Sequence, residues 1–148
     1  MARRPPDRNR PDDRVPPDFE VCVAGRPISA QSHNAERLAA WKRVVRAIAL
    51  EHWPSERQMF EGEVALRITH YAQYRFVDMD NLAKPIQDAL QGICYREDRL
   101  VDVAANWRDI NGRFRVRHMS LPLARAFSDG REFVHVRLWV AGGERDLG

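Results

Sequence analysis

The chain has 148 residues, of which 44% are hydrophobic and 30% are charged, and its 24 basic against 21 acidic side chains leave a formal charge of +3. This is the length of one domain, and such a chain buries enough surface to fold without disulfides or metal staples. The two cysteines form no pair motif, and no apolar run approaches the roughly 20 residues that span a bilayer. These features exclude a secreted disulfide scaffold and a membrane protein. We therefore expect a cytoplasmic protein that does not bind a membrane.

The net charge is distributed unevenly along the chain. Residues 1–17 carry five arginines, three aspartates and five of the nine prolines, which predicts a disordered basic tail. We expect residues 18–141 to form one folded domain and residues 142–148 to form a frayed C-terminal tail. Within the domain, residues 78–102 hold six acidic and three basic side chains, a charge of −3. An acidic island in a mildly basic surround is typical of a cation-dependent enzyme that acts on a polyanion, although chance clustering of solvated charge gives the same composition.

Hydrophobic periodicity predicts the elements of the first half of the chain. Residues 19–23 alternate apolar and polar side chains, which predicts a strand closed by a turn. Apolar residues then recur every three or four positions over residues 35–53, which predicts an amphipathic helix that ends before Pro54. Residues 64–69 alternate again and predict a half-buried strand.

The second half of the chain predicts one further helix and three strands. A helix over residues 80–93 has one apolar stripe, an N-cap at Asp80 or Asn81, and an irregular start where Pro85 removes a backbone donor. The order of elements predicts an α+β fold, a single compact domain in which two main helices pack on a mixed or mainly antiparallel sheet. The remaining strands are expected at residues 100–103, 113–117 and 133–140.

Acidic side chains gather around the start of this second helix. In an extended chain Asp78 and Asp80 point to the same side. In a helix Asp80, Lys84 and Asp88 are successive neighbours on the face opposite the apolar stripe. Carboxylates so close together repel one another unless a cation lies between them, and Mg²⁺ takes oxygen ligands of this kind.

A second acidic pair, Glu97 and Asp98, stands at the start of the following strand and supplies a further candidate ligand. All these residues also have a structural interpretation, in which Asp80 caps the helix, Lys84 pairs with its acidic neighbours and the second pair lies in a turn. Lys84 favours the functional interpretation. The chain has only two lysines among its 24 basic residues, and a lysine is a compact point charge suited to a phosphate.

The spacing of these residues resembles the signature of the RusA-type Holliday-junction resolvases, and the resemblance covers about residues 18–140. It implies a homodimeric, Mg²⁺-dependent endodeoxyribonuclease, with Mn²⁺ as a substitute, that cuts four-way junctions symmetrically in recombination and repair. Its partner is branched double-stranded DNA, and it uses no nucleotide cofactor. The matching residues are, in order, Asp78-x-Asp80-Asn81-Leu82-x-Lys84, Asp88-Ala89-Leu90, Glu97-Asp98 and Val101.

The resemblance implies a catalytic role for four of these positions. Asp78, Asp80 and Asp98 are the expected metal-binding catalytic carboxylates. Lys84 is the expected catalytic lysine. The hypothesis is that bound Mg²⁺ activates a water and, with the lysine, stabilises the charge that develops on the phosphate.

Other positions are expected to support these four. Asn81, Asp88 and Glu97 are expected behind the metal ligands, where they orient them. Contacts to DNA phosphates are expected from arginines on either side of the acidic region. These are Arg75, Arg113, Arg115 and Arg117.

Two alternatives remain open at this point. The same catalytic residues suit a less selective Mg²⁺-dependent nuclease that acts on flaps or other branched DNA. The second alternative is a junction-binding protein without catalysis, because Glu97 replaces the aspartate that the family usually carries. An Asp-x-Asp enzyme of phosphate or nucleotide-sugar chemistry is disfavoured, since the chain has no Gly-rich phosphate loop.

Overall fold

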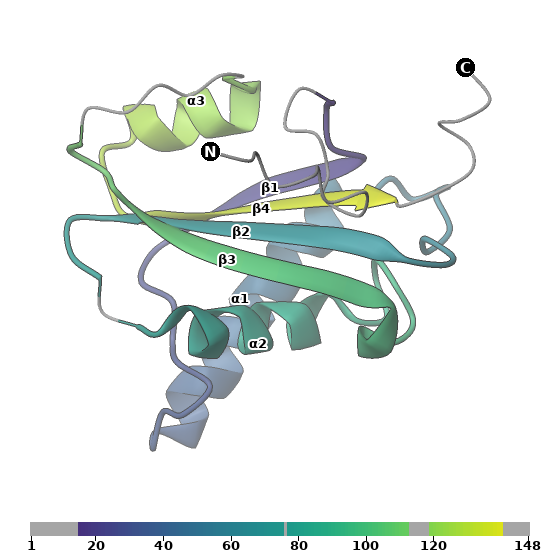
Figure 1. Ribbon diagram of the computed structural model, residues 1–148, viewed down its shortest axis with the longest axis horizontal. Coiled ribbons are helices and arrows are strands. Elements are labelled where there is room, and N and C mark those ends of the chain that lie inside the picture. The colour runs from purple at the N-terminus through teal and green to yellow at the C-terminus, as the bar shows by residue number, and fades with distance from the viewer. Residues whose placement is uncertain (1–14, 76, 113–118, 141–148) are drawn as a thin grey trace, which may run out of the picture.

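A computed structural model describes residues 15–75, 77–112 and 119–140, which form a four-stranded sheet flanked by helices (Figure 1). The strand order is β1-β4-β2-β3; β2 and β3 are parallel and the other pairs are antiparallel. The predicted α+β fold with a mixed sheet is therefore confirmed. In chain order the elements are β1 (Phe19–Ala24), α1 (Ala35–His52), β2 (Val64–Ala72), α2 (Met79–Leu90), the 3₁₀ helix η1 (Asp98–Leu100), β3 (Val101–Asp109), α3 (Leu121–Ser128) and β4 (Phe133–Val140).

Helices α1 and α2 pack on the same face of the sheet, as Figure 1 shows. Side chains alternate along a strand, so every second strand residue meets these helices, including the fully buried Leu66 and Val136. The predicted apolar stripe of α2 is buried in this core, with Leu82, Ile86 and Leu90 fully enclosed. Burying a side chain of this size contributes about 1.5–3 kcal/mol, so the stripe holds α2 firmly and leaves its opposite side free for polar residues.

The start of α2 differs from the prediction in two respects. The N-cap is Asp78 rather than Asp80 or Asn81, and its side chain makes no capping hydrogen bond. The helix also runs continuously through Pro85 instead of starting irregularly. Pro85 has no N–H to donate to the carbonyl of Asn81, four residues earlier. That carbonyl instead accepts a hydrogen bond from the N–H of Ala30 at 2.9 Å.

Strand β3 is longer than the sequence pattern predicts. Strand β3 continues well beyond residues 100–103, because its pairing with β2 continues to the partners Ala72 and Asp109. The strand predicted over residues 113–117, and the tail residues 1–14 and 142–148, lie outside the described residues. Among the helices that the structure describes, none combines the length and the apolar character needed to cross a membrane.

Helix α3 has no counterpart among the predicted elements. It carries start signals nevertheless: Ser120 is its N-cap and accepts a hydrogen bond from the N–H of Leu123 at 3.3 Å, and Pro122 lies in its first turn. It packs on the sheet face opposite α1 and α2, where Leu123 forms a small cluster with Tyr71 and Phe133.

A buried hydrogen-bonded group ties α3 to this second face. The Glu20 carboxylate accepts a hydrogen bond from the Ser120 hydroxyl at 2.7 Å and a short one from Nε2 of His135. Burial lowers the pKa of His135, and its bond to Glu20 offsets this only in part. Burial alone would raise the pKa of Glu20, but the bonds from His135 and Ser120 outweigh it and hold that pKa below its ordinary value. A neutral imidazole that donates to an ionised carboxylate accounts for both directions.

The free energy of unfolding is therefore expected to fall as the pH is lowered from about 7 toward 4. Buried His135 stays neutral while the unfolded chain takes up a proton below about pH 6.5, and Glu20 loses its favoured ionisation below its ordinary pKa of 4.5. Urea denaturation at several pH values measures this. His135→Gln should flatten the dependence between pH 7 and 5, and the same change at exposed His33 should not. Stability that rises on acidification would contradict the assignment.

Candidate active site

A turn after α2 brings the second acidic pair back toward the helix. Helix α2 ends at Leu90 rather than at residue 93, because Gln91 is extended and Gly92 adopts a φ of +88°, a left-handed conformation that favours glycine. The N–H of Gly92 donates to the carbonyl of Tyr95 at 2.8 Å and closes the turn. Buried Tyr95 anchors the returning chain, which places η1 and its first residue, Asp98, beside the middle of α2.

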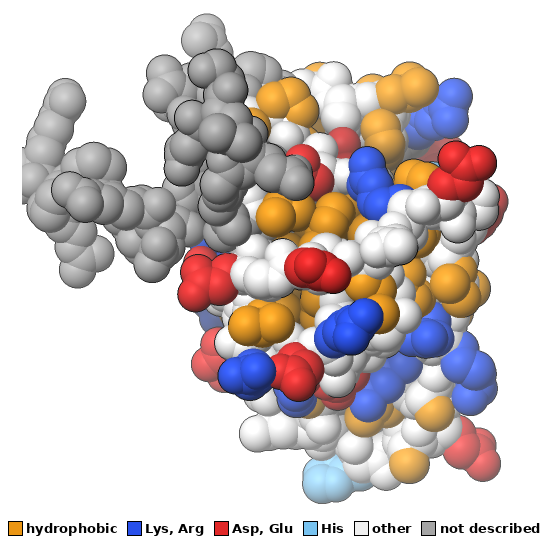
Figure 2. Space-filling view, turned by 90° about the vertical axis from the view of Figure 1, so that its right-hand side faces the viewer, with side chains coloured by type: hydrophobic (Ala, Val, Ile, Leu, Met, Phe, Trp, Pro, Cys, Tyr) orange, Lys and Arg blue, Asp and Glu red, His pale blue; other side chains and the backbone are white. Residues whose placement is uncertain are grey.

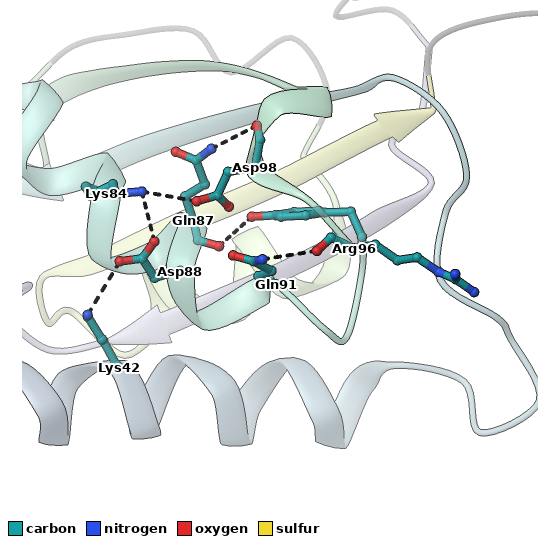
Figure 3. A network of polar contacts seen from close by, with 8 residues as sticks. Lys42, Lys84, Gln87, Asp88, Gln91, Arg96 and Asp98 are labelled. Carbon is teal, nitrogen blue, oxygen red and sulfur yellow. Dashed lines mark hydrogen bonds and ion pairs between the residues drawn. The ribbon is translucent and has the colours of Figure 1, made fainter.

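Lys84 lies between two carboxylates on the polar side of α2 (Figure 3). Its Nζ is 3.1 Å from Oδ1 of Asp88 and 3.1 Å from Oδ2 of Asp98. The other oxygen of Asp88 is 3.5 Å from Nζ of Lys42, which reaches across from α1. We call these four residues the Lys84 network. The hydrogen bonds to Asp88 and then to Asp98 raise the pKa of Lys84, so its side chain is an ammonium at neutral pH.

Neutral groups fix the backbone around the network. The side-chain amide of Gln87 approaches the carbonyl of Asp98 at 3.5 Å, and the hydroxyl of Tyr95 donates to the carbonyl of Gln87 at 2.6 Å. One turn further on, the amide of Gln91 donates to the carbonyl of Arg96 at 3.0 Å. The returning chain is therefore tied at three points to α2 and to Gln91, the residue that follows it, which restricts the position of Asp98.

The two carboxylate oxygens of Asp98 differ in their hydrogen bonding. Oδ2 accepts from Lys84, whereas Oδ1 is buried and has no hydrogen-bond partner in the described part of the chain. A buried polar atom left unpaired costs about 1–3 kcal/mol. The side chain as a whole is 29% exposed, so it can be reached from solvent. Its chemistry is that of an oxygen ligand for a hard divalent cation.

Asp78 and Asp80 do not join the Lys84 network. Asp78 is 67% exposed, with Oδ1 3.8 Å from a guanidinium nitrogen of Arg75. Asp80 is exposed in the first turn of α2, one turn before Lys84, and its carboxylate makes no hydrogen bond or ion pair with a described residue. Within the described ranges, no three Asp, Glu, His or Cys side chains are grouped so as to hold a metal ion. The three aspartates expected to be ligands nevertheless offer carboxylate oxygens alone, a donor set that fits Mg²⁺.

The residues expected to support the site are placed differently from one another. Asp88 is part of the network, whereas Asn81 uses its carbonyl to satisfy Ala30. Glu97 forms an ion pair with Arg99, two residues further on, and its carboxylate is directed to that partner. Arg75 lies beside Asp78, as described above. The other predicted DNA contacts, Arg113, Arg115 and Arg117, lie outside the described residues.

Three residues of the site were not among the candidates from sequence. Lys42 could have been found, because it is the only other lysine of the chain. Gln87 stands three residues after Lys84 and seven after Asp80, so helical spacing places it on the same face. Tyr95 acts through its hydroxyl from a buried position after the turn, and no sequence pattern indicates that contact.

The surface around η1 carries both signs of charge. Figure 2 views the end of the molecule at which β2 and β3 begin, and acidic and basic side chains alternate there with apolar ones. Basic side chains gather in the lower right part of this face, next to the region of mixed charge. A polyanion approaching from this side would meet mixed charge beside a more basic region.

Comparison with known proteins assigns the chain to a class. The family model described as endodeoxyribonuclease RusA matches residues 21–117, about two thirds of the chain, and the chain therefore belongs to the RusA endodeoxyribonuclease family. The matched range contains the Lys84 network together with Asp78 and Asp80. The resemblance to RusA-type Holliday-junction resolvases is thereby confirmed. A comparison with curated proteins finds no match.

The network is expected to contribute little to stability. Lys84 is 54% exposed, and exposed ion pairs contribute about 0–1 kcal/mol, so Lys84→Met should lower the free energy of unfolding by about 1 kcal/mol at most. Ile86→Ala, on the buried side of the same helix, should cost about 2–5 kcal/mol. Urea denaturation of both variants measures the difference. Equal losses would show that Lys84 supports the fold rather than a site.

Proposed function

We propose that this protein is a Mg²⁺-dependent endodeoxyribonuclease that resolves four-way DNA junctions by symmetric phosphodiester hydrolysis, in recombination and repair in the cytoplasm. Membership of the RusA family supports the nuclease activity and the branched double-stranded DNA substrate. The observation that carries the assignment of the site is the 3.1 Å contact of Lys84 with Asp98. It joins two separate parts of the family signature, one on α2 and the other at the start of η1.

Asp78, Asp80 and Asp98 are the proposed metal ligands, for Mg²⁺ or for Mn²⁺ in its place. The uncommitted Oδ1 of Asp98 and the exposed carboxylates of the other two support this assignment. When bound, Mg²⁺ supplies a Lewis acid that lowers the pKa of a bound water and stabilises negative charge on the phosphate. A set of carboxylates with one nearby ammonium is well suited to hold such an ion against a phosphodiester.

Lys84 serves as a fixed positive charge rather than as a general base. Its two carboxylate partners keep it protonated, and a protonated amine has no lone pair with which to accept a proton. Asp88 acts as a positioning residue, because it holds Lys84 from one side while Lys42 holds Asp88 from the other. An ammonium held in this way is directed toward the position where charge develops on the phosphate.

The proposal includes a homodimer. A two-fold symmetric pair presents two equivalent sites related by one axis, and this matches the symmetry of a four-way junction. Phosphate contacts are assigned to arginines outside the acidic region, because mixed charge surrounds the described part of the site. These arginines are Arg75, Arg113, Arg115 and Arg117.

Cleavage of a labelled, mobile four-way junction by Asp80→Asn tests the proposal. The wild-type protein should cut two opposed strands symmetrically in Mg²⁺ or Mn²⁺ and should not cut in EDTA. Asp80→Asn should abolish cleavage and leave junction binding intact or tighter, because one negative charge is removed from beside the phosphate. Glu56→Gln removes an exposed carboxylate on another part of the surface and should cut as the wild type does.

Parallel assays separate the alternatives. Cleavage by Asp80→Asn in Mg²⁺ would contradict the assignment of the site. Equal cutting of junctions, flaps and other branched DNA would favour the less selective nuclease. Junction binding by the wild type, without cutting after metal is restored, would favour a binding protein without catalysis.

A further inference from the structure

Strand β1 forms one edge of the sheet, at the opposite border from β3. The N–H of Gly25 donates to the carbonyl of Glu132 at 2.9 Å, and in an antiparallel pair every second residue from there faces the partner strand. The residues in between direct their backbone groups outward, and the structure's described residues make no backbone hydrogen bond to them. The outward-facing residues are Glu20, Cys22 and Ala24.

Within the described part of the chain, this edge has no lysine, proline, bulge or covering strand to protect it. Proteins blunt such edges with lysine, proline, a bulge or a covering segment, because unpaired N–H and C=O groups attract other chains. The sequence of β1, Phe-Glu-Val-Cys-Val-Ala, has no lysine and no proline, and its register with β4 is regular over all six residues. The edge is thus suited to accept a further strand.

A groove of about 280 Å³ lies beside this edge, bounded by β1 and α3. Its apolar lining includes Leu121, which is 63% exposed, and Phe133. Its charged lining includes two exposed arginines, Arg125 and Arg131, against one acidic side chain, Asp129. Neither arginine forms an ion pair with a described residue. The groove therefore combines free backbone groups, apolar contacts and an excess of positive charge.

We propose that this groove binds an extended acidic peptide segment of a partner protein, which adds as a strand to the outer edge of β1. Main-chain hydrogen bonds to β1 supply the binding, and alternate side chains of the peptide reach the apolar and basic parts of the groove. Carboxylates of the peptide pair with Arg125 and Arg131. A second copy of this chain is the poorer occupant, because the β1 strand that it would add carries one acidic residue, Glu20, and that carboxylate is already bonded to Ser120 and His135.

The groove lies beside β1 at one edge of the sheet, whereas Asp98 of the Lys84 network immediately precedes β3 at the other edge. Peptide binding can therefore be measured in EDTA, apart from any cleavage. The outcome of the peptide-binding experiment therefore does not depend on whether the nuclease assignment is correct.

Fluorescence anisotropy with a fluorescein-labelled eight-residue peptide that alternates Glu and Val tests the proposal on the full chain. The acidic peptide should bind, and its counterpart that alternates Lys and Val should bind at least about tenfold more weakly, which corresponds to about 1.4 kcal/mol. The double variant Arg125→Glu with Arg131→Glu should lose at least about tenfold in affinity for the acidic peptide. Arg37→Glu, an exposed charge reversal on α1, should not.

A second arm needs no protein variant. Two peptides are compared, one methylated at the backbone nitrogens of Glu and the other at those of Val, so that each lacks the donors on one side of the strand; one of the two should lose binding. Full affinity of both methylated peptides, or an unchanged affinity of the double variant, would overturn the proposal. So would a peptide that dissociates a dimer of the protein, because the edge of β1 would then belong to a second copy.

Discussion

The contact between Lys84 and Asp98 joins α2 to the start of η1, and the arrangement of the site depends on it. Two features of the fold make the contact possible. The buried stripe of α2 fixes which side of that helix faces outward, and the turn at Gly92 returns the chain along the helix. Buried Tyr95 then fixes the register of the returning segment through its bond to Gln87. A polar site is thus held by apolar packing on the other side of one helix.

Helix α2 carries its stabilising residues and its candidate site residues on opposite sides. Fully buried residues such as Ile86 supply the favourable free energy, whereas the outward side carries groups that oppose folding or add little to it. The unpaired Oδ1 of Asp98 is the clearest of these, since a buried oxygen without a partner is unfavourable. Exposed Asp80, one turn before Lys84, adds negative charge without a compensating described contact. Groups of this kind persist where a ligand or substrate satisfies them.

The sequence predicted the α+β class, both main helices and the face of α2 that carries the acidic residues, because these follow from periodicity. The sequence did not indicate which acidic residues form ion pairs with Lys84. Asp80 and Asp88 are equally spaced from that lysine along a helix, whereas Asp98 reaches it only through a turn whose course depends on tertiary packing. The contribution of Lys42 is likewise a contact between two helices. The eight-residue helix α3 is too short for periodicity to indicate, and its cap and proline were its only signals.

The proposed role of Asp98 as a metal ligand held beside Lys84 is tested most directly by binding of Mn²⁺, followed through the electron paramagnetic resonance signal of the free ion. Asp98→Asn should weaken Mn²⁺ binding at least about tenfold, because the ligand itself is altered and even residues behind metal ligands change affinity by about 10–100-fold. Asp102→Asn, at an exposed position on β3, should bind Mn²⁺ as the wild type does. Equal Mn²⁺ affinity of the wild type and Asp98→Asn would contradict this role.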